Sequence, residues 1–91
     1  MLPDFTDRRG GRRFAVEGEV TLAFVDSVPH EVSGQLTDFS RSGFRVTHGY
    51  CLFVPGQIVR YSHVLAKGQA KVVWNRIIGD MVETGFLIVP E

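Results

Sequence analysis

The 91-residue chain carries ten acidic and ten basic side chains, and 44% of its residues are apolar. This length allows one compact domain and excludes two, and the composition is that of a chain with a folded core. Its apolar stretches are far shorter than the roughly 20 residues that a membrane-spanning helix requires, so no membrane insertion is expected.

The amino-terminal sequence MLPDFTDRR places acids before its arginines and has no apolar core, which argues against a secretory signal. Cys51 is the one cysteine of the sequence, so it cannot form an internal disulfide, which fits a reducing compartment. We therefore expect a cytoplasmic protein.

Charge is distributed unevenly along the chain. Residues 1–13 carry four arginines against Asp4 and Asp7, a balance of +2, and the rest of the chain carries six basic against eight acidic residues, a balance of −2. A nonspecific nucleic-acid binder spreads basic residues over a face, because its affinity comes from neutralising many phosphates. The concentration at one end instead favours a ligand with few phosphates.

Residues 1–13 predict a flexible arm. They are polar, contain Pro3 and the Gly10-Gly11 pair, and show no apolar periodicity. From Phe14 onward the pattern becomes that of β-structure, so residues 14–91 are expected to form one barrel domain.

Apolar residues then alternate with polar ones, as half-buried strands demand. The first strand has Val16, Val20, Leu22 and Phe24 on one face, and a turn is expected at Asp26-Ser27 and Pro29. Further strands are expected at 32–37, at 44–48, at about 57–63, at about 68–76 and at about 82–89, with an apolar link at 50–54 and a hairpin turn at Gly79-Asp80. Short strands broken by Gly or Pro about every ten residues predict an all-β, six-stranded antiparallel β-barrel.

The segment DFSRSG, residues 38–43, follows the second expected strand. One interpretation is a turn that connects two strands, with Asp38 and Ser40 bonded to nearby backbone and Gly43 supplying a backbone angle closed to most residues. In the other interpretation, the same polar groups face a ligand: a carboxylate can accept hydrogen bonds from guanine, and a hydroxyl or backbone amide can donate to a phosphate.

Four arginines, Arg8, Arg9, Arg12 and Arg13, lie around the two glycines of the arm. A basic cluster is most often a solvated surface. Arginine also forms paired hydrogen bonds to phosphate and to the N7/O6 edge of guanine, and it stacks on purine rings. These four residues are therefore candidates for binding a nucleotide.

The order of these features resembles the PilZ domain, a family of bacterial receptors for cyclic di-GMP. An R-x-x-x-R motif is followed by a short strand, by D-x-S-x-x-G and by a barrel that contains a V-V-W strand and a G-F strand. The similarity runs from about Arg8 to Val89. Two motifs in this order make it far more specific than either motif alone.

Two registers satisfy R-x-x-x-R: Arg8 with Arg12, and Arg9 with Arg13. The second is preferred, because the sequence RFAV at 13–16 resembles the family's passage from the second arginine into the first strand. Arg8 then matches an extra arginine often found before the motif. The resemblance implies that Arg9 and Arg13 clamp the guanine edges and phosphates of one or two ligand molecules.

The resemblance also implies roles for the second motif. Asp38 would read a guanine, Ser40 would contact phosphate or base, and Gly43 would hold the turn open. Arg41 and Ser42 occupy the motif's variable positions, and Arg41 is a further candidate for contacting the ligand. PilZ domains commonly continue into a carboxy-terminal helix, for which this sequence leaves little or no room. Either the chain is a minimal version of the domain, or the place of the helix is left bare or is filled by another subunit of a homodimer.

The remaining candidate residues give weaker indications of function. The three histidines, His30, His48 and His63, lack metal-site spacing and are expected to be surface or partly buried strand residues, and Cys51 is expected to fill a small part of the core. Trp74 and Phe86 lie at alternating strand positions and are expected in the core, although an exposed aromatic ring could stack on a base. The sequence has no P-loop, no G-x-S-x-G and no dinucleotide-binding motif, so neither an enzyme nor a cofactor is expected.

The leading hypothesis is a cyclic di-GMP receptor whose arm becomes ordered over the ligand and which signals through a partner protein. Motility, polysaccharide synthesis and transcription are all pathways that the resemblance allows. One alternative is a PilZ-like interaction module that binds no nucleotide. Another is a small barrel that binds single-stranded nucleic acid, which the negative balance of residues 14–91 disfavours.

Overall fold

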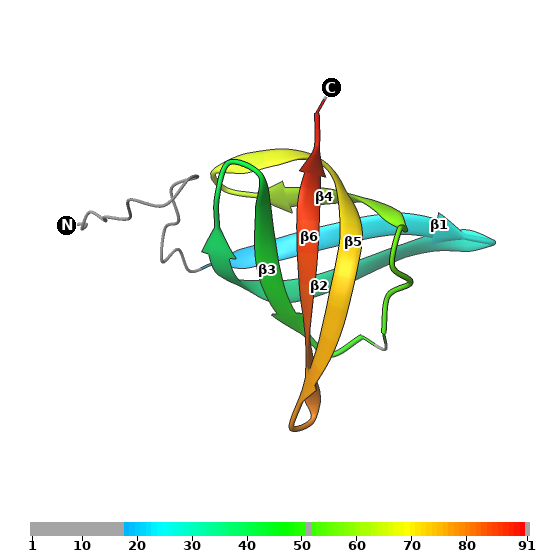
Figure 1. Cartoon of the computed structure of the whole chain (residues 1–91). Coiled ribbons are helices and arrows are strands. Elements are labelled where there is room, and N and C mark those ends of the chain that lie inside the picture. The colour runs from blue at the N-terminus through cyan, green and yellow to red at the C-terminus, as the bar shows by residue number, and fades with distance from the viewer. Residues whose placement is uncertain (1–17, 51, 91) are drawn as a thin grey trace.

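Six antiparallel strands close into a barrel in the computed structural model, which describes residues 18–50 and 52–90 (Figure 1). The strands follow one another around it in the order β1-β2-β3-β6-β5-β4. Their bounds are β1 Glu19–Asp26, β2 Val28–Phe39, β3 Gly43–His48, β4 Ile58–His63, β5 Ala66–Ile78 and β6 Met81–Val89. The predicted all-β fold and its six strands are confirmed, and the described residues include no helix. The predicted arm, the first residues of the barrel domain at 14–17, and Cys51 lie outside the described residues.

The barrel interior is filled by the apolar side of the alternating pattern. In β1, β3 and β4 the buried residues lie at every second position, because successive residues of a strand point to opposite faces. Aromatic rings dominate the centre, with the Phe44 and Phe86 rings stacked 5.0 Å apart and Phe53 edge-on to Phe24 at 5.5 Å. The buried apolar residues are Val20, Leu22, Phe24, Val32, Leu36, Phe44, Val46, Phe53, Val59, Tyr61, Ala70, Val72 and Phe86.

The first hairpin turns more tightly than the sequence suggests. Asp26 pairs with Val28 across Ser27 alone, and Ser27 adopts a positive φ of 72°. Pro29, expected to mark the turn, instead lies in β2 opposite Val25. It is tolerated because β2 pairs with β3 only from Gly34 onward, so this part of β2 has β1 as its one neighbouring strand. The second predicted hairpin turn, at Gly79-Asp80, is confirmed.

Two β-bulges reverse the inward–outward alternation at a defined point in each of two strands. In β2, Leu36 pairs with Val46 but Asp38 pairs with Arg45, so Thr37 is an extra residue. In β5, Val72 pairs with Phe86 but Trp74 pairs with Gly85, so Val73 is extra.

The β5 bulge corrects one expectation. Trp74 was expected in the core, but after the bulge it lies outside the barrel and is 36% exposed. Phe86, for which the same expectation was made, is 3% exposed, and the expectation is confirmed.

A polar network closes one end of the core. The expectation of a surface or partly buried histidine is wrong for His63, which is 8% exposed, and for His48, which is only 1% exposed. The Nδ1 of His48 accepts from the Tyr50 N–H (3.2 Å), so its Nε2 carries the proton and donates to Thr84 Oγ1 (2.7 Å). Thr84 Oγ1 donates in turn to Asn75 Oδ1 (2.9 Å), and Asn75 Nδ2 donates to the Phe53 carbonyl (2.8 Å). This network anchors the link between β3 and β4 to β5 and β6.

Within the described part of the chain, no helix is long and apolar enough to cross a membrane.

Candidate ligand-binding site

A hollow of about 350 Å³ opens on the outside of the barrel, beside the turn between β2 and β3. The turn contributes Ser40 and Gly43 to one wall, together with Asp38 at the end of β2. The opposite wall comes from Trp74 on β5 and Gly85 on β6. The hollow therefore spans four neighbouring strands, and three predicted site residues lie on one side of it.

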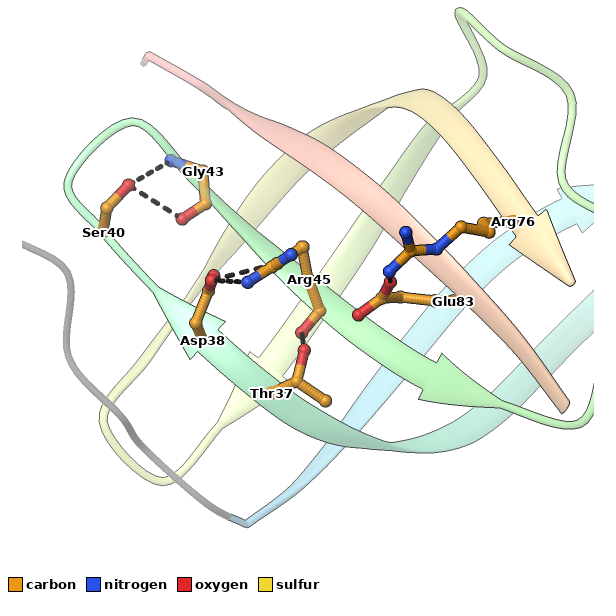
Figure 2. A network of polar contacts seen from close by, with 7 residues as sticks. All are labelled: Thr37, Asp38, Ser40, Gly43, Arg45, Arg76 and Glu83. Atoms are coloured by element: carbon orange, nitrogen blue, oxygen red, sulfur yellow. Dashed lines mark hydrogen bonds and ion pairs between the residues drawn. The ribbon is translucent and has the colours of Figure 1, made fainter. Parts of the chain in front are cut away.

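Ser40 holds the turn together from inside. Its backbone N–H donates to the Gly43 carbonyl (2.7 Å), and its Oγ accepts from the Gly43 N–H (3.2 Å) and lies 3.1 Å from the Gly43 carbonyl, to which it donates. Figure 2 shows the Ser40 hydroxyl facing both backbone atoms of Gly43. The turn chemistry expected of Ser40 is thus present, and its hydroxyl is hydrogen-bonded within the turn.

Gly43 is required for a reason other than the expected one. Its φ is not among the positive values of the described residues, so no special backbone angle is involved. A Cβ at this position would instead lie 2.4 Å from the Phe86 carbonyl oxygen on the neighbouring β6. The absent side chain lets β3 and β6 approach each other beneath the turn.

Asp38 is not in the loop, where the sequence placed it, but near the end of β2. The bulge at Thr37 directs it to the same face as Arg45, while Phe39 turns inward and stacks on Phe44 at 5.8 Å. Arg45 Nε donates to Asp38 Oδ2 (2.9 Å), and Arg45 Nη2 bonds to the same oxygen (Figure 2). Asp38 is 8% exposed, so this ion pair is partly shielded from water.

The electrostatics of the hollow centre on Arg45. Its pKa is raised above the usual value, first by the hydrogen bond to Asp38 and then by the charges of Asp38 and Glu83, while burial opposes the rise. Glu83 itself accepts from Arg76 at 2.7 Å. Arg45 therefore places a permanent cation in the wall of the hollow, within a short row of paired charges (Figure 2).

Trp74 lies at the β5 end of a row of paired residues that crosses four strands. Across the four strands, Asp38 pairs with Arg45, Arg45 with Gly85, and Gly85 with Trp74. A Cβ on Gly85 would lie 2.3 Å from the indole ring, so the glycine lets the ring lie flat against β6. The result is an aromatic surface on β5 and a guanidinium on β3, the two strands that flank β6, in one hollow.

Arg45 and Trp74 were missed as site residues by the sequence. In the sequence, Trp74 alternates with Val72, which predicts a core position, and Arg45 alternates with Phe44 and Val46, which predicts an outward strand residue with no further role. Arg45 does lie outward, but its pairing with Asp38 and the exposure of Trp74 depend on the two bulges, of which the alternation pattern gives no sign.

The remaining predicted residues are placed as follows. Arg41 is exposed in the turn and does not line the hollow. The arginines Arg8, Arg9, Arg12 and Arg13 lie outside the described residues. The chain enters the described part at Gly18, whose carbonyl accepts from the Leu36 N–H at 2.9 Å, two residues before Asp38. The segment that carries these arginines is thus joined to the barrel next to the strand that leads into the hollow.

No group of three metal-binding side chains occurs among residues 18–50 and 52–90. No model of a known protein family matches the chain, and a search of curated proteins found no match.

Proposed function

We propose that this protein is a PilZ-type receptor for cyclic di-GMP that acts in the cytoplasm through a partner protein. The observation that carries the proposal is the hollow itself, in which Asp38, Ser40 and Gly43 face Trp74 across about 350 Å³. Such a space suits a purine, whose ring can stack on an indole while its edge hydrogen-bonds to a carboxylate. The position of Gly18 beside Leu36 supports a ligand that is held from the other side by Arg9 and Arg13.

Binding in this proposal involves an exchange of partners at Asp38. Arg45 holds the Asp38 carboxylate, so a guanine must compete with the guanidinium for Oδ2. The displaced cation would still line the hollow, where it can pair with a ligand phosphate. Ordering of residues 1–13 over the ligand would then couple occupancy to a new protein surface.

Isothermal titration calorimetry with cyclic di-GMP tests the proposal. We expect a dissociation constant of about 1 µM or tighter, raised about 10- to 100-fold by Arg9→Ala, Arg13→Ala or Asp38→Ala, because each change removes a charged hydrogen-bonding group. Lys67→Ala is the matched control, since it removes an exposed cation that does not line the hollow. Unchanged binding in all three variants would refute the roles assigned to these residues.

A second candidate is an interaction module that binds no nucleotide. It is favoured by the present pairing of Ser40 with Gly43 and of Asp38 with Arg45, which would be sufficient for a purely structural turn. A calorimetric titration without heat of binding, in a protein that remains folded, would support this candidate over the receptor.

A further inference from the structure

The described strands separate the two signs of charge. Strands β4 and β5 carry four basic residues and no acidic one, whereas β1 and β2 carry four acidic residues and no basic one. The basic residues are Arg60, Lys67, Lys71 and Arg76, and the acidic residues are Glu19, Asp26, Glu31 and Asp38. The barrel is therefore polarised although the chain as a whole is neutral.

Three of the four basic residues take part in no ion pair with another described residue. Arg76 pairs with Glu83, but Arg60, Lys67 and Lys71 take part in none of the ion pairs between described residues. All three are exposed. Within residues 18–50 and 52–90, no direct ion pair neutralises these three charges.

Strand register places these three cations on one outward face, which we call the basic face. Arg60 lies opposite Gln69, and Lys67 lies opposite Ser62, two residues along β4 from Arg60. Lys71 lies opposite Ile58, two residues along β4 in the other direction. Arg60 is therefore a diagonal neighbour of both lysines, at about 7–8 Å between backbone positions.

The basic face is hollowed rather than flat. A depression of about 470 Å³ lies between Arg60 and Lys67, and Ser62 and Gln69 add polar side chains to its walls. Like charges on diagonal neighbours repel each other, so the face gains stability when an anionic group lies among them.

We propose that the basic face docks an extended acidic segment of a partner protein. Lys67 and Lys71 are four residues apart on β5, which is about 13 Å along a strand. In an extended peptide, side chains on one face repeat every second residue, about 6.6–6.8 Å apart. Two or three acids at alternate positions therefore match the spacing of the three cations.

Other anions fit the basic face less well. A single phosphate cannot contact cations spread over about 13 Å. A nucleic acid requires basic residues that continue over a longer surface. On the neighbouring strands, however, Arg60 pairs with Ala23 of β1, and Ala23 pairs with Glu31 of β2. The exposed Glu31 and Glu19 on this side would repel a phosphate backbone. The short basic face bounded by acids favours a peptide of limited length.

The basic face is distinct from the candidate ligand hollow. Both involve β5, but the residues that line the two depressions do not overlap. The inference consequently stands whether or not the protein binds cyclic di-GMP.

Amide NMR of the full chain, titrated with a synthetic decapeptide of alternating Glu and Ser, tests the inference. We expect shifts concentrated at residues 58–63 and 66–71, with a dissociation constant on the order of 1 mM at low salt that weakens as salt is added. Lys67→Gln should weaken binding about two- to fivefold, and Arg60→Gln/Lys67→Gln/Lys71→Gln should abolish the shifts.

Arg41→Gln is the matched control, because it removes one exposed cation from the β2–β3 turn and should leave the affinity unchanged. Three results would overturn the inference: equal shifts on the basic face with inorganic phosphate, tighter binding of an oligothymidylate at the same residues, or peptide shifts that persist in the folded triple variant. The dispersion of the amide spectrum reports in each case whether the variant is folded.

Discussion

At the scale of single residues, two glycines shape the hollow. Gly43 lets β3 lie close to the Phe86 carbonyl, and Gly85 leaves room for the Trp74 ring. The motif glycine thus has a packing role that holds irrespective of any ligand. Its importance can be tested by stability alone.

Gly43→Ala should destabilise the protein by about 1–3 kcal/mol, because the new methyl group meets a backbone carbonyl that cannot rotate away. Urea unfolding measures this loss. Gly49→Ala is the control, since a Cβ there meets no atom within 4 Å and the residue has no positive φ. Equal stability of the two variants would contradict the close approach of β3 to β6.

At the scale of elements, the bulges in β2 and β5 create the site. Each inserts one residue, after which the side chains that follow exchange faces. Asp38 and Trp74 reach the outside of the barrel in this way, and Phe39 reaches the core. The four-strand row from Asp38 to Trp74 exists because both bulges fall near the same end of the β3–β6 pair.

Trp74 is the one tryptophan of the sequence, so its fluorescence reports this arrangement directly. Its emission should be that of a partly exposed indole, accessible to acrylamide, and should be quenched when cyclic di-GMP stacks on it. Asp38→Ala should keep the emission of the free protein but reduce the ligand-induced change. Emission typical of a fully buried indole would show that β5 has no bulge at Val73.

At the scale of the whole molecule, the buried His48 network links stability to pH. Burial lowers the pKa of His48 below its usual value of 6.5, because the interior disfavours the charged ring. The unfolded chain therefore binds the proton more readily than the folded chain. The contribution of His48 to stability is complete above about pH 6.5 and is lost as the pH falls below it.

His48→Gln should reduce this pH dependence. The glutamine amide can accept from the Tyr50 N–H and donate to Thr84, as the neutral imidazole does, but it does not titrate. The free energy of unfolding, measured between pH 7.5 and about pH 5, should fall less in the variant than in the unmodified protein. A parallel decline in both proteins would assign the pH dependence to other groups.

The sequence by itself determined the all-β class, the six strands and most of the core, because alternation of apolar residues directly reflects which side of a strand is buried. It also identified the residues of the turn between β2 and β3. Only the tertiary structure decided that Asp38 pairs with Arg45, that Trp74 leaves the core and that Gly43 is required by Phe86. These features depend on register and on contacts between strands distant in sequence, and an inserted bulge residue leaves no signal in local periodicity.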